Sequence, residues 1–305
     1  MKKQTNIAYL YICHNNPELL GRVANVLEYN EDTIFVHVDN KVDITPFIEA
    51  TKNHKNVRFI NERVKNYWGG FNSIVATVGL MRMAINHGEY SRFVLLQGQD
   101  YPLFSPKEIH AFFDNNDIEY CRAKDITISK DKKDYMKWAG YWIMDSHYTN
   151  LFAKGIRFII SKINRLGIKY RSGIFCSNGE NWHVFKGWAQ FALTNTCVQH
   201  IISVYDNNKK FNRFMKHRFP PDEIYFHTII HNSHFKEKVC DNVIIRRNGE
   251  KTLLNLTYFE YPVYVTVFTE SSDYQWLKTT GCLFVRKVND TSEALLNEID
   301  RNIMI

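Results

Sequence analysis

We predict an α/β fold for this chain, with a mainly parallel central sheet flanked by helices. The prediction depends on two features of the first hundred residues: short apolar runs that suit buried strands, and segments between them whose apolar residues repeat at helical spacing. Strands that alternate with helices form parallel sheets, which bind their ligands at the carboxyl ends of the strands. The length of 305 residues is compatible with one large domain, and we expect residues 1–305 to form one.

The elements of the first half follow in order. Ile7 to Cys13 is an apolar strand that meets His14-Asn15-Asn16-Pro17, and apolar residues at helical spacing then extend from Leu19 to Leu27. Two further strands, a helix and another strand are expected, in that order, at residues 33–38, 57–60, 75–85 and 92–96.

The second half is less regular. We expect a basic helix over residues 151–165 and a second helix over residues 189–205. Pro221-Asp222-Glu223 is expected to open a third helix, because proline is common at the first helical position and carboxylates complement the positive end of the helix dipole.

Composition narrows the class of protein without fixing it. The net charge of +7 favours anionic partners such as nucleotides, phospholipid surfaces or nucleic acid. The aromatic content of 14% suits stacking on sugars or bases as well as core packing. Six cysteines without a C-x-x-C pair indicate free thiols in a reducing compartment. Because no apolar stretch approaches the roughly 18 to 20 residues that span a bilayer, we expect a soluble cytoplasmic protein.

Two segments carry carboxylates of interest. Asp100 closely follows the predicted strand 92–96, and it is either a turn residue or a substrate contact. One carboxylate beside neutral amides is a poor site for Mg²⁺ or Mn²⁺, and the sequence has no Asp-x-Asp triplet. At Pro221, the two following carboxylates either complement the helix dipole or place Glu223 in a cleft as a general base.

Arg286 and Lys287 follow the apolar run 282–285 near the end of the chain. They are either a solvated pair after an edge strand or two fixed cations that bind a diphosphate, because the planar fork of arginine beside the point charge of lysine suits two phosphate groups. Such cations would replace the metal that Asp-x-Asp enzymes use to hold the leaving group in sugar transfer from a nucleoside diphosphate.

Other candidates leave two interpretations open. Asp39 and Lys41, just past the strand 33–38, are placed to receive a nucleoside, although a turn uses Asp-Asn equally often. Trp182 either stacks on a sugar face or belongs to the core. A histidine stripe lacks both the glutamate of H-E-x-x-H and a cysteine pair, so we expect a structural or solvent-exposed role for His227, His231 and His234.

Together these segments resemble glycosyltransferase family 14, which holds the core-2 and I-branching β-1,6-N-acetylglucosaminyltransferases and the peptide O-xylosyltransferases. The resemblance extends from about Ile7 to Val288. Each motif is weak alone, but their order and spacing are specific. The motifs are His14 with Pro17, His37-Val38-Asp39-x-Lys41, Trp68-Gly69-Gly70, Gly98-x-Asp100-Tyr101-Pro102-Leu103, Gly179-x-x-Trp182, Pro221-Asp222-Glu223 and Phe284-x-Arg286-Lys287.

The resemblance implies a GT-A fold, inversion at the anomeric carbon, a UDP-sugar donor, and no divalent metal or other cofactor. It places the catalytic base on Glu223 and the diphosphate-binding cations on Arg286 and Lys287. We expect a nucleotide-binding half at about 1–120 and an acceptor and catalytic half at about 121–305. The nucleoside pocket is expected to include His14, Asp39 and Lys41, and the donor-sugar and acceptor region Asp100, Asn181, Trp182 and Asp222.

The chain departs from the family pattern before its last strand. Where relatives usually show Arg-Tyr-Ile-Asp-Trp, residues 255–260 are Asn-Leu-Thr-Tyr-Phe-Glu, so the acceptor pocket is not carried over. We also expect neither the membrane anchor nor the paired cysteines of the animal Golgi members. We therefore expect a small bacterial relative that builds a surface polysaccharide or a lipid-linked glycan.

The basic helix expected at 151–165 has two contrasting faces. Its apolar face comprises Phe152, Ile156, Ile159, Ile160 and Ile163, and its basic face Lys154, Arg157, Lys162 and Arg165. Such a helix either lies on an anionic membrane leaflet, where lipid-linked acceptors reside, or packs on the protein core.

We therefore predict an inverting, metal-independent glycosyltransferase that moves a sugar, expected to be N-acetylglucosamine, from UDP to a hydroxyl of a glycan or lipid-linked glycan. Nucleic acid is not an expected partner. The alternative is a non-catalytic glycan- or polyanion-binding module, which would ignore UDP.

Overall fold

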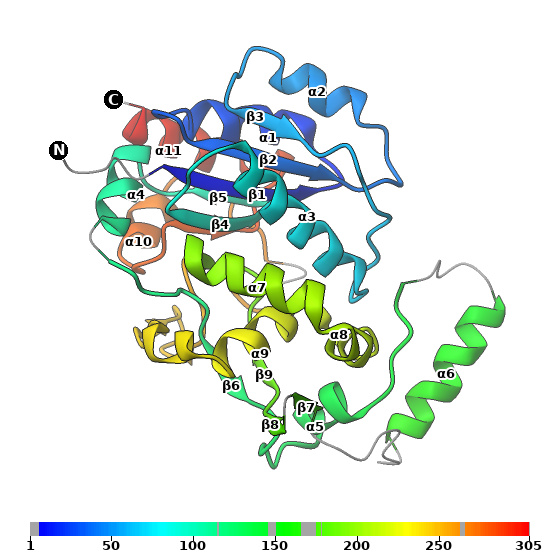
Figure 1. Cartoon of the computed structure of the whole chain (residues 1–305). Coiled ribbons are helices and arrows are strands. Elements are labelled where there is room, and N and C mark those ends of the chain that lie inside the picture. The colour runs from blue at the N-terminus through cyan, green and yellow to red at the C-terminus, as the bar shows by residue number, and fades with distance from the viewer. Residues whose placement is uncertain are drawn as a thin grey trace.

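The structure is a computed structural model that describes residues 6–114, 116–145, 151–165, 175–177, 179–262 and 266–304. Its central sheet has the strand order β10-β4-β1-β2-β3 (Figure 1). β1 (Ile7–Cys13) pairs in parallel with β2 (Thr33–Val38) and β4 (Arg92–Gln97), and β2 pairs in parallel with β3 (Val57–Phe59). β10 (Ala192–Thr194) adds an antiparallel edge. The α/β fold with a mainly parallel sheet is confirmed.

Helices cover both faces of this sheet, because successive side chains of a strand point to opposite sides. Tyr9 and Tyr11 belong to one core cluster, whereas Ala8 and Leu10 belong to the other. Helices that contribute to the first cluster include α1 (Pro17–Val26), α4 (Pro106–Phe113), α10 (Asp273–Lys278) and α11 (Glu293–Ile303). Those that contribute to the second include α3 (Asn72–His87), α7 (Asn195–Asn207), α8 (Lys209–Met215) and α9 (Tyr225–His231).

A second sheet carries two of the predicted site residues. β14 (Phe284–Arg286) lies between β13 (Thr257–Tyr258) and β5 (Asp100–Pro102). Of the two interpretations of Arg286, the solvated pair after an edge strand is therefore excluded, because β14 is paired on both sides and Arg286 is its last residue. Asp100 is the first residue of a strand rather than a simple turn residue.

Two predicted helices begin later than expected. The helix predicted from residue 189 begins at Asn195, because residues 192–194 pair with β4 instead, and the Thr194 side chain accepts a hydrogen bond from the backbone of Cys197 as the helix cap. Pro221–Glu223 forms a short 3₁₀ turn, η1, and α9 starts only at Tyr225.

The remaining elements are short or lie outside the main sheet. The helices are α2 (Thr45–Thr51), α5 (Lys132–Ala139), α6 (Leu151–Arg165), η2 (His234–Lys238) and η3 (Asp290–Ser292). Three antiparallel pairs join β6 (Ala123–Asp125) to β9 (Phe185–Gly187), β7 (Phe175–Ser177) to β8 (Glu180–Trp182), and β11 (Ile244–Ile245) to β12 (Lys251–Thr252).

Helix α6 stands away from the main sheet (Figure 1). Near its carboxyl end the buried Asn164 side chain bonds to both backbone groups of Tyr141, at 3.0 Å to the nitrogen and 3.1 Å to the oxygen. Large apolar side chains nearer its amino end are exposed, namely Leu151, Phe152, Phe158 and Ile159. No helix among the described residues is both long enough and apolar enough to cross a bilayer.

Candidate active site

The ends of β1 and β2 bring the predicted nucleoside residues together. Cys13 and Val38 are paired in the last register position, so the segments that follow them lie side by side. The backbone N–H of Asp39 donates to the carbonyl of Cys13 at 2.9 Å. His14, the next residue after β1, is exposed. Because the carboxyl ends of parallel strands are the usual ligand edge, His14 and Asp39 lie where a nucleotide is expected.

The Asp39 carboxylate also organises its own loop. It is buried, and its Oδ1 accepts hydrogen bonds from the backbone N–H groups of Lys41 at 2.9 Å and Asn66 at 3.3 Å. Its Oδ2 lies 3.2 Å from Nζ of Lys41, and that ammonium lies 4.3 Å from the ring centroid of Tyr67. The turn and the nucleoside interpretations of Asp39 are thus compatible, because the carboxylate that fixes the turn also lies at the carboxyl ends of β1 and β2.

Asp100 and Arg286 form an ion pair between neighbouring strands. They face each other in the β5–β14 register, and Nη1 of Arg286 lies 2.7 Å from Oδ1 of Asp100, whose side chain is fully buried. Oδ2 of Asp100 accepts from the backbone N–H of Gln97 at 2.8 Å. Burial raises the pKa of Asp100, and the neighbouring Arg286 charge opposes that shift. Asp100 therefore orients Arg286.

Lys287 adds a second cation at the end of β14. It is half-buried, and burial together with the adjacent Arg286 charge lowers its pKa, while Asp100 opposes the shift. Two cations share one carboxylate here. An additional anion between them would therefore be favoured electrostatically.

Glu223 is paired with a lysine that the sequence did not single out. Its Oε2 lies 2.5 Å from Nζ of Lys186 on β9, and the two side chains are 21% and 12% exposed. The Lys186 ammonium also lies 5.3 Å from the ring centroid of Trp188. The partly exposed carboxylate of Glu223 is thus held in place by a cation while one side remains open to solvent.

Asp222 has a different environment from its neighbour. Its Oδ1 is buried and has no hydrogen-bond partner among the residues that the structure describes. Burial, followed by the Glu223 charge, raises the pKa of Asp222 to about 7. Two adjacent carboxyl groups in different environments can hold one proton between them near neutral pH.

One short segment connects the two charged clusters. Lys186 contacts Glu223, and four residues later the Gln190 side chain donates to Oε1 of Gln97 at 3.4 Å and also bonds to Asp100. Four extended residues span at most about 14 Å. The candidate base and the Asp100 ion pair therefore contact the two ends of one short segment, residues 186–190.

An aromatic group lies next to η1. Trp68 is 74% exposed, and its ring meets Phe219 edge-on with 5.0 Å between centroids. Phe219 in turn stacks on Trp142 at 4.8 Å. Because Phe219 precedes Pro220 and η1, this surface is close in sequence to Glu223, and an exposed indole suits stacking on a sugar ring.

Backbone conformation and close packing explain why glycine occupies both positions after Trp68. Gly69 has a φ of +71°, a conformation that favours glycine. A Cβ on Gly70 would lie 2.1 Å from Oδ1 of Asp145. The Asp145 carboxylate accepts hydrogen bonds from the backbone of Phe71 and Asn72 at the start of α3. The absence of a side chain on Gly70 therefore allows the Asp145 carboxylate to bind the backbone at the start of α3.

Trp182 and Asn181 lie on β8. Trp182 is half-buried, with its ring centroid 5.1 Å from that of Phe211 and 5.8 Å from that of Phe175. These contacts favour the core interpretation of Trp182. Asn181 is exposed, which leaves it accessible to a ligand.

The histidines of the predicted stripe have structural contacts. His227 is fully buried between the carbonyls of Trp188 and Cys121, and burial lowers its pKa to about 4. His231 stacks on Phe185 with 4.6 Å between centroids. Within the described ranges, no group of three or more His, Cys, Asp or Glu side chains is placed to hold a metal ion.

Lys186 is the principal residue that sequence reasoning missed. It belongs to no motif, and its partner Glu223 is distant in the chain, so no local signal indicated the pair. Trp68 belongs to the Trp-Gly-Gly motif, but nothing in the sequence showed that its indole is exposed.

The mainly parallel sheet flanked by helices, with polar residues at the carboxyl ends of β1, β2 and β4, is consistent with a GT-A-like glycosyltransferase fold. The chain belongs to the family described as Core-2/I-Branching enzyme, whose family model matches residues 7–247. The resemblance found in the sequence is thereby confirmed. Arg286 and Lys287 lie beyond the matched range.

Curated relatives are xylosyltransferases with low sequence identity to this chain. Xylosyltransferase 2 of Homo sapiens is 24% identical over 259 residues, which cover 81% of this chain and 27% of that protein. Xylosyltransferase 2 of Rattus norvegicus gives the same identity and coverage. Xylosyltransferase 1 of Homo sapiens is 20% identical over 258 residues, 81% of this chain and 24% of that protein. The chain thus spans about a quarter of the length of the curated relatives that it matches.

Proposed function

We propose that this chain is an inverting glycosyltransferase that moves a sugar from a UDP-sugar to a hydroxyl of a glycan acceptor. The observation that carries the proposal is the placement of Glu223. Its carboxylate is partly exposed, is held by Lys186, and lies at one end of a short segment whose other end reaches the Asp100–Arg286 ion pair. Family membership supports the same class of reaction.

In the proposed reaction, Glu223 acts as general base. It removes the proton of the acceptor hydroxyl while the oxygen attacks the anomeric carbon, and the bond from that carbon to the diphosphate oxygen breaks. The electron pair leaves with UDP, the proton remains on Glu223, and the configuration inverts because attack and departure occur on opposite faces. The Lys186 ammonium holds the Glu223 carboxylate in place, and its charge favours the ionised form of the neighbouring Asp222.

Arg286 and Lys287 stabilise the departing diphosphate in this proposal. A guanidinium has five N–H donors in a rigid fork, so the bond from Nη1 to Asp100 leaves other donors for phosphate oxygens. Lys287 supplies a second positive charge beside it. We propose that these cations replace a divalent metal, so that transfer is metal-independent.

The two ends of the substrate are assigned by position. His14, Asp39 and Lys41 would line the nucleoside pocket at the ends of β1 and β2, and exposed Trp68 would stack on the donor or acceptor sugar. We propose N-acetylglucosamine or xylose as the transferred sugar. The names of the curated relatives favour xylose.

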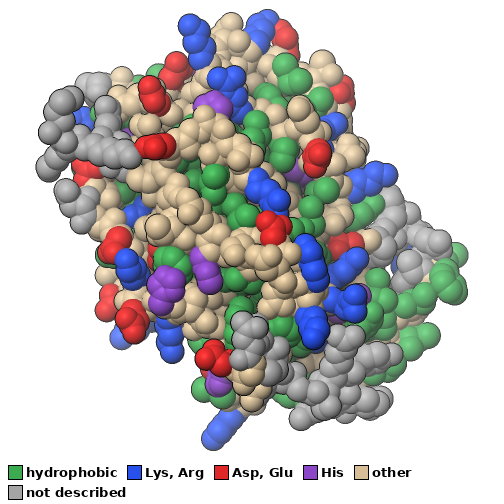
Figure 2. Space-filling model, viewed as in Figure 1, with side chains coloured by type: hydrophobic (Ala, Val, Ile, Leu, Met, Phe, Trp, Pro, Cys, Tyr) green, Lys and Arg blue, Asp and Glu red, His purple; other side chains and the backbone are tan. Residues whose placement is uncertain are grey.

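Helix α6 supports a proposed contact with an anionic membrane. Phe152 and Ile159 of its apolar face are exposed, and so are Lys154 and Lys162 of its basic face, whereas Ile160 is half-buried. Hydrophobic side chains gather on the surface at the right edge of Figure 2, where Figure 1 places α6. The side chains of Arg157 and Arg165 lie outside the described part. An exposed face that is both apolar and basic suits a lipid-linked acceptor and a cytoplasmic, peripheral location in a bacterium that builds surface polysaccharide.

The contact is tested by co-sedimentation with vesicles that contain anionic phospholipid. Changing Lys154, Arg157, Lys162 and Arg165 together to Gln should abolish binding, because the electrostatic attraction is lost. Binding that persists unchanged would contradict the membrane role and would leave sugar transfer unaffected.

The function is tested by a panel of UDP-sugars in the presence of EDTA, with transfer and hydrolysis both measured. One donor should react without metal, and Glu223→Gln should lower kcat by about 10²–10⁴-fold while UDP still binds. Glu49→Gln, an exposed change on α2, is the control. Full activity of Glu223→Gln would refute the assignment, and a chain that ignores UDP would be a glycan- or polyanion-binding module instead.

A further inference from the structure

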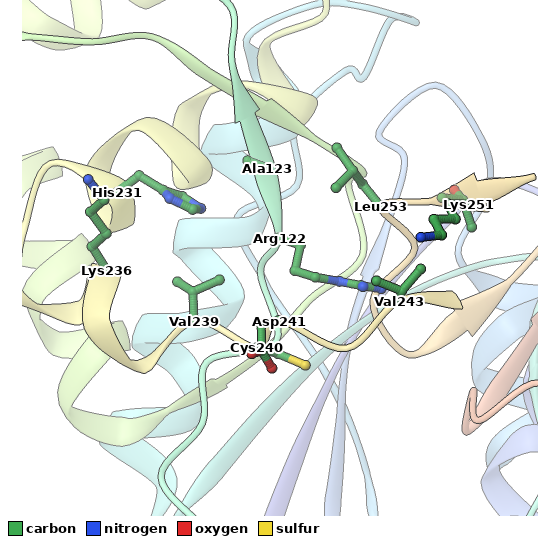
Figure 3. Close-up of a pocket in the computed structure, with 11 residues that line it drawn as sticks. Arg122, Ala123, His231, Lys236, Val239, Cys240, Asp241, Val243, Lys251 and Leu253 are labelled. Carbon is green, nitrogen blue, oxygen red and sulfur yellow. The ribbon is translucent and has the colours of Figure 1, made fainter. Parts of the chain in front are cut away.

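We propose that this chain has a second binding site, for a small organic anion, in a pocket distinct from the candidate active site. The pocket has a volume of about 460 Å³, in the range of small-molecule sites. It lies between the start of β6, the η2 region and the β11–β12 hairpin (Figure 3). None of the residues assigned to sugar transfer lines it.

The floor of the pocket contains an incompletely paired cation. Arg122 is 6% exposed, and its side chain extends from β6 across the pocket toward Val243 (Figure 3). Its Nε is buried and has no hydrogen-bond partner among the residues described by the structure. A buried guanidinium donor without a partner is costly, and an anionic ligand would supply the missing acceptor.

The other charged side chains of the pocket favour the same ligand. Lys236 and Lys251 line it as exposed side chains, and Asp241 is the one carboxylate in the lining. Burial and the Lys236 charge lower the pKa of His231, so this imidazole is neutral near pH 7. Three cations therefore face one carboxylate, and the pocket retains a positive excess for an anion.

The rest of the lining determines the kind of anion. Val239, Val243 and Leu253 contribute branched apolar side chains on both sides of Arg122 (Figure 3). A fully hydrated inorganic ion would gain nothing from these walls, whereas an apolar group attached to the anion would bury surface against them. The matching ligand class is a phosphate or carboxylate that carries a short apolar part.

The topology separates this pocket from the diphosphate site. Leu253 precedes β13, which runs parallel to β14, and Arg286 and Lys287 lie at the carboxyl end of β14. The pocket lies toward the amino ends of the same strands. Likewise, Glu223 precedes the first residue of α9, whereas His231 is its last. A ligand bound here would not compete with UDP.

The test is calorimetry in a phosphate-free buffer with n-butyl phosphate, butyrate and uncharged n-butanol. At least one of the two anions should bind, the tighter of them identifying the preferred head group, while n-butanol should not. Arg122→Met should weaken anion binding by about 10–100-fold, because a charge-assisted hydrogen bond is lost, and Arg122→Lys should recover part of it. Arg58→Met, which removes an exposed arginine of β3, should bind as the wild type does.

Saturating UDP should leave the affinity for n-butyl phosphate unchanged. If Arg122→Met fails to fold, the exposed Lys251→Met should still lower the affinity by roughly twofold to fivefold. Wild-type affinity in a folded Arg122→Met, displacement of the anion by UDP, or equal binding of n-butanol would each overturn the proposal.

Discussion

Removing the charge of Lys186 is the most informative perturbation of the proposed base. The ammonium of Lys186 lies 2.5 Å from Oε2 of Glu223, and both side chains are mostly buried. At an effective dielectric constant of about 20, the Coulomb attraction at this distance is about 7 kcal/mol, and desolvation of both groups offsets most of it. We expect Lys186→Met to lower the free energy of unfolding by about 1–3 kcal/mol.

The same change should alter the pH dependence of transfer. The Lys186 charge lowers the pKa of Asp222, against the larger effects of burial and of Glu223. Without Lys186, Asp222 holds its proton to higher pH, so the acidic limb of kcat against pH should move to higher pH. Lys186→Arg keeps the positive charge, so the acidic limb of its pH profile should lie where that of the wild type lies.

The assay is kcat measured from pH 5 to 9, with unfolding by urea as the measure of stability. Lys124→Met is a matched control, because Lys124 lies opposite Lys186 in the β6–β9 pair but its ammonium contacts Asp134, at 2.7 Å. Lys124→Met should therefore have the same acidic limb of kcat against pH as the wild type. A Lys186→Met enzyme that is destabilised but keeps the wild-type pH profile would refute the link between this lysine and the base.

Three further changes test other parts of the structure. The pKa of Asp222 is about 7 in the folded protein, against about 3.9 for an unfolded aspartate, so the folded state binds more protons between these values and stability falls as the pH rises through this window. Relative to wild type, the free energy of unfolding of Asp222→Asn should therefore rise by up to about 4 kcal/mol between pH 4 and pH 8, as measured by urea titration. A difference between the two proteins that is independent of pH would contradict this. Asp100→Asn leaves the Arg286 charge buried without its carboxylate and should cost about 3–5 kcal/mol by the same method; a cost near zero would show that solvent already satisfies Arg286. Gly187→Ala places a Cβ 2.2 Å from the carbonyl oxygen of Arg122 and 2.5 Å from Cε1 of His227, so it should lower stability by at least about 1–3 kcal/mol, and an unchanged melting temperature would show that β9 shifts freely.

Local sequence patterns were sufficient to predict the four parallel strands of the central sheet. The strand predicted at 33–38 has these bounds in the structure, because apolar residues fill four of its six positions and Asp32 and Asp39 flank it. The segment from Phe191 to Leu193 was misassigned to a helix, since a short apolar run next to a helix suits either structure. Only its pairing with β4 makes it a strand, and this is a tertiary contact.

The site was predicted as a set of residues but not as an arrangement. Motif order indicated Glu223, Asp100 and Arg286 separately, whereas the ion pair between the last two joins residues 186 positions apart. Lys186 had no motif at all. Such pairs depend on how strands are aligned, which no local pattern records.

The binding of UDP in EDTA tests the central proposal most directly, namely that fixed cations at the end of β14 hold the diphosphate. Calorimetry should show UDP binding without metal, and Lys287→Met should weaken it about tenfold or more, whereas Lys52→Met, an exposed change just after α2, should not. UDP binding that appears only after Mn²⁺ is added, or an unchanged Kd in Lys287→Met, would contradict it.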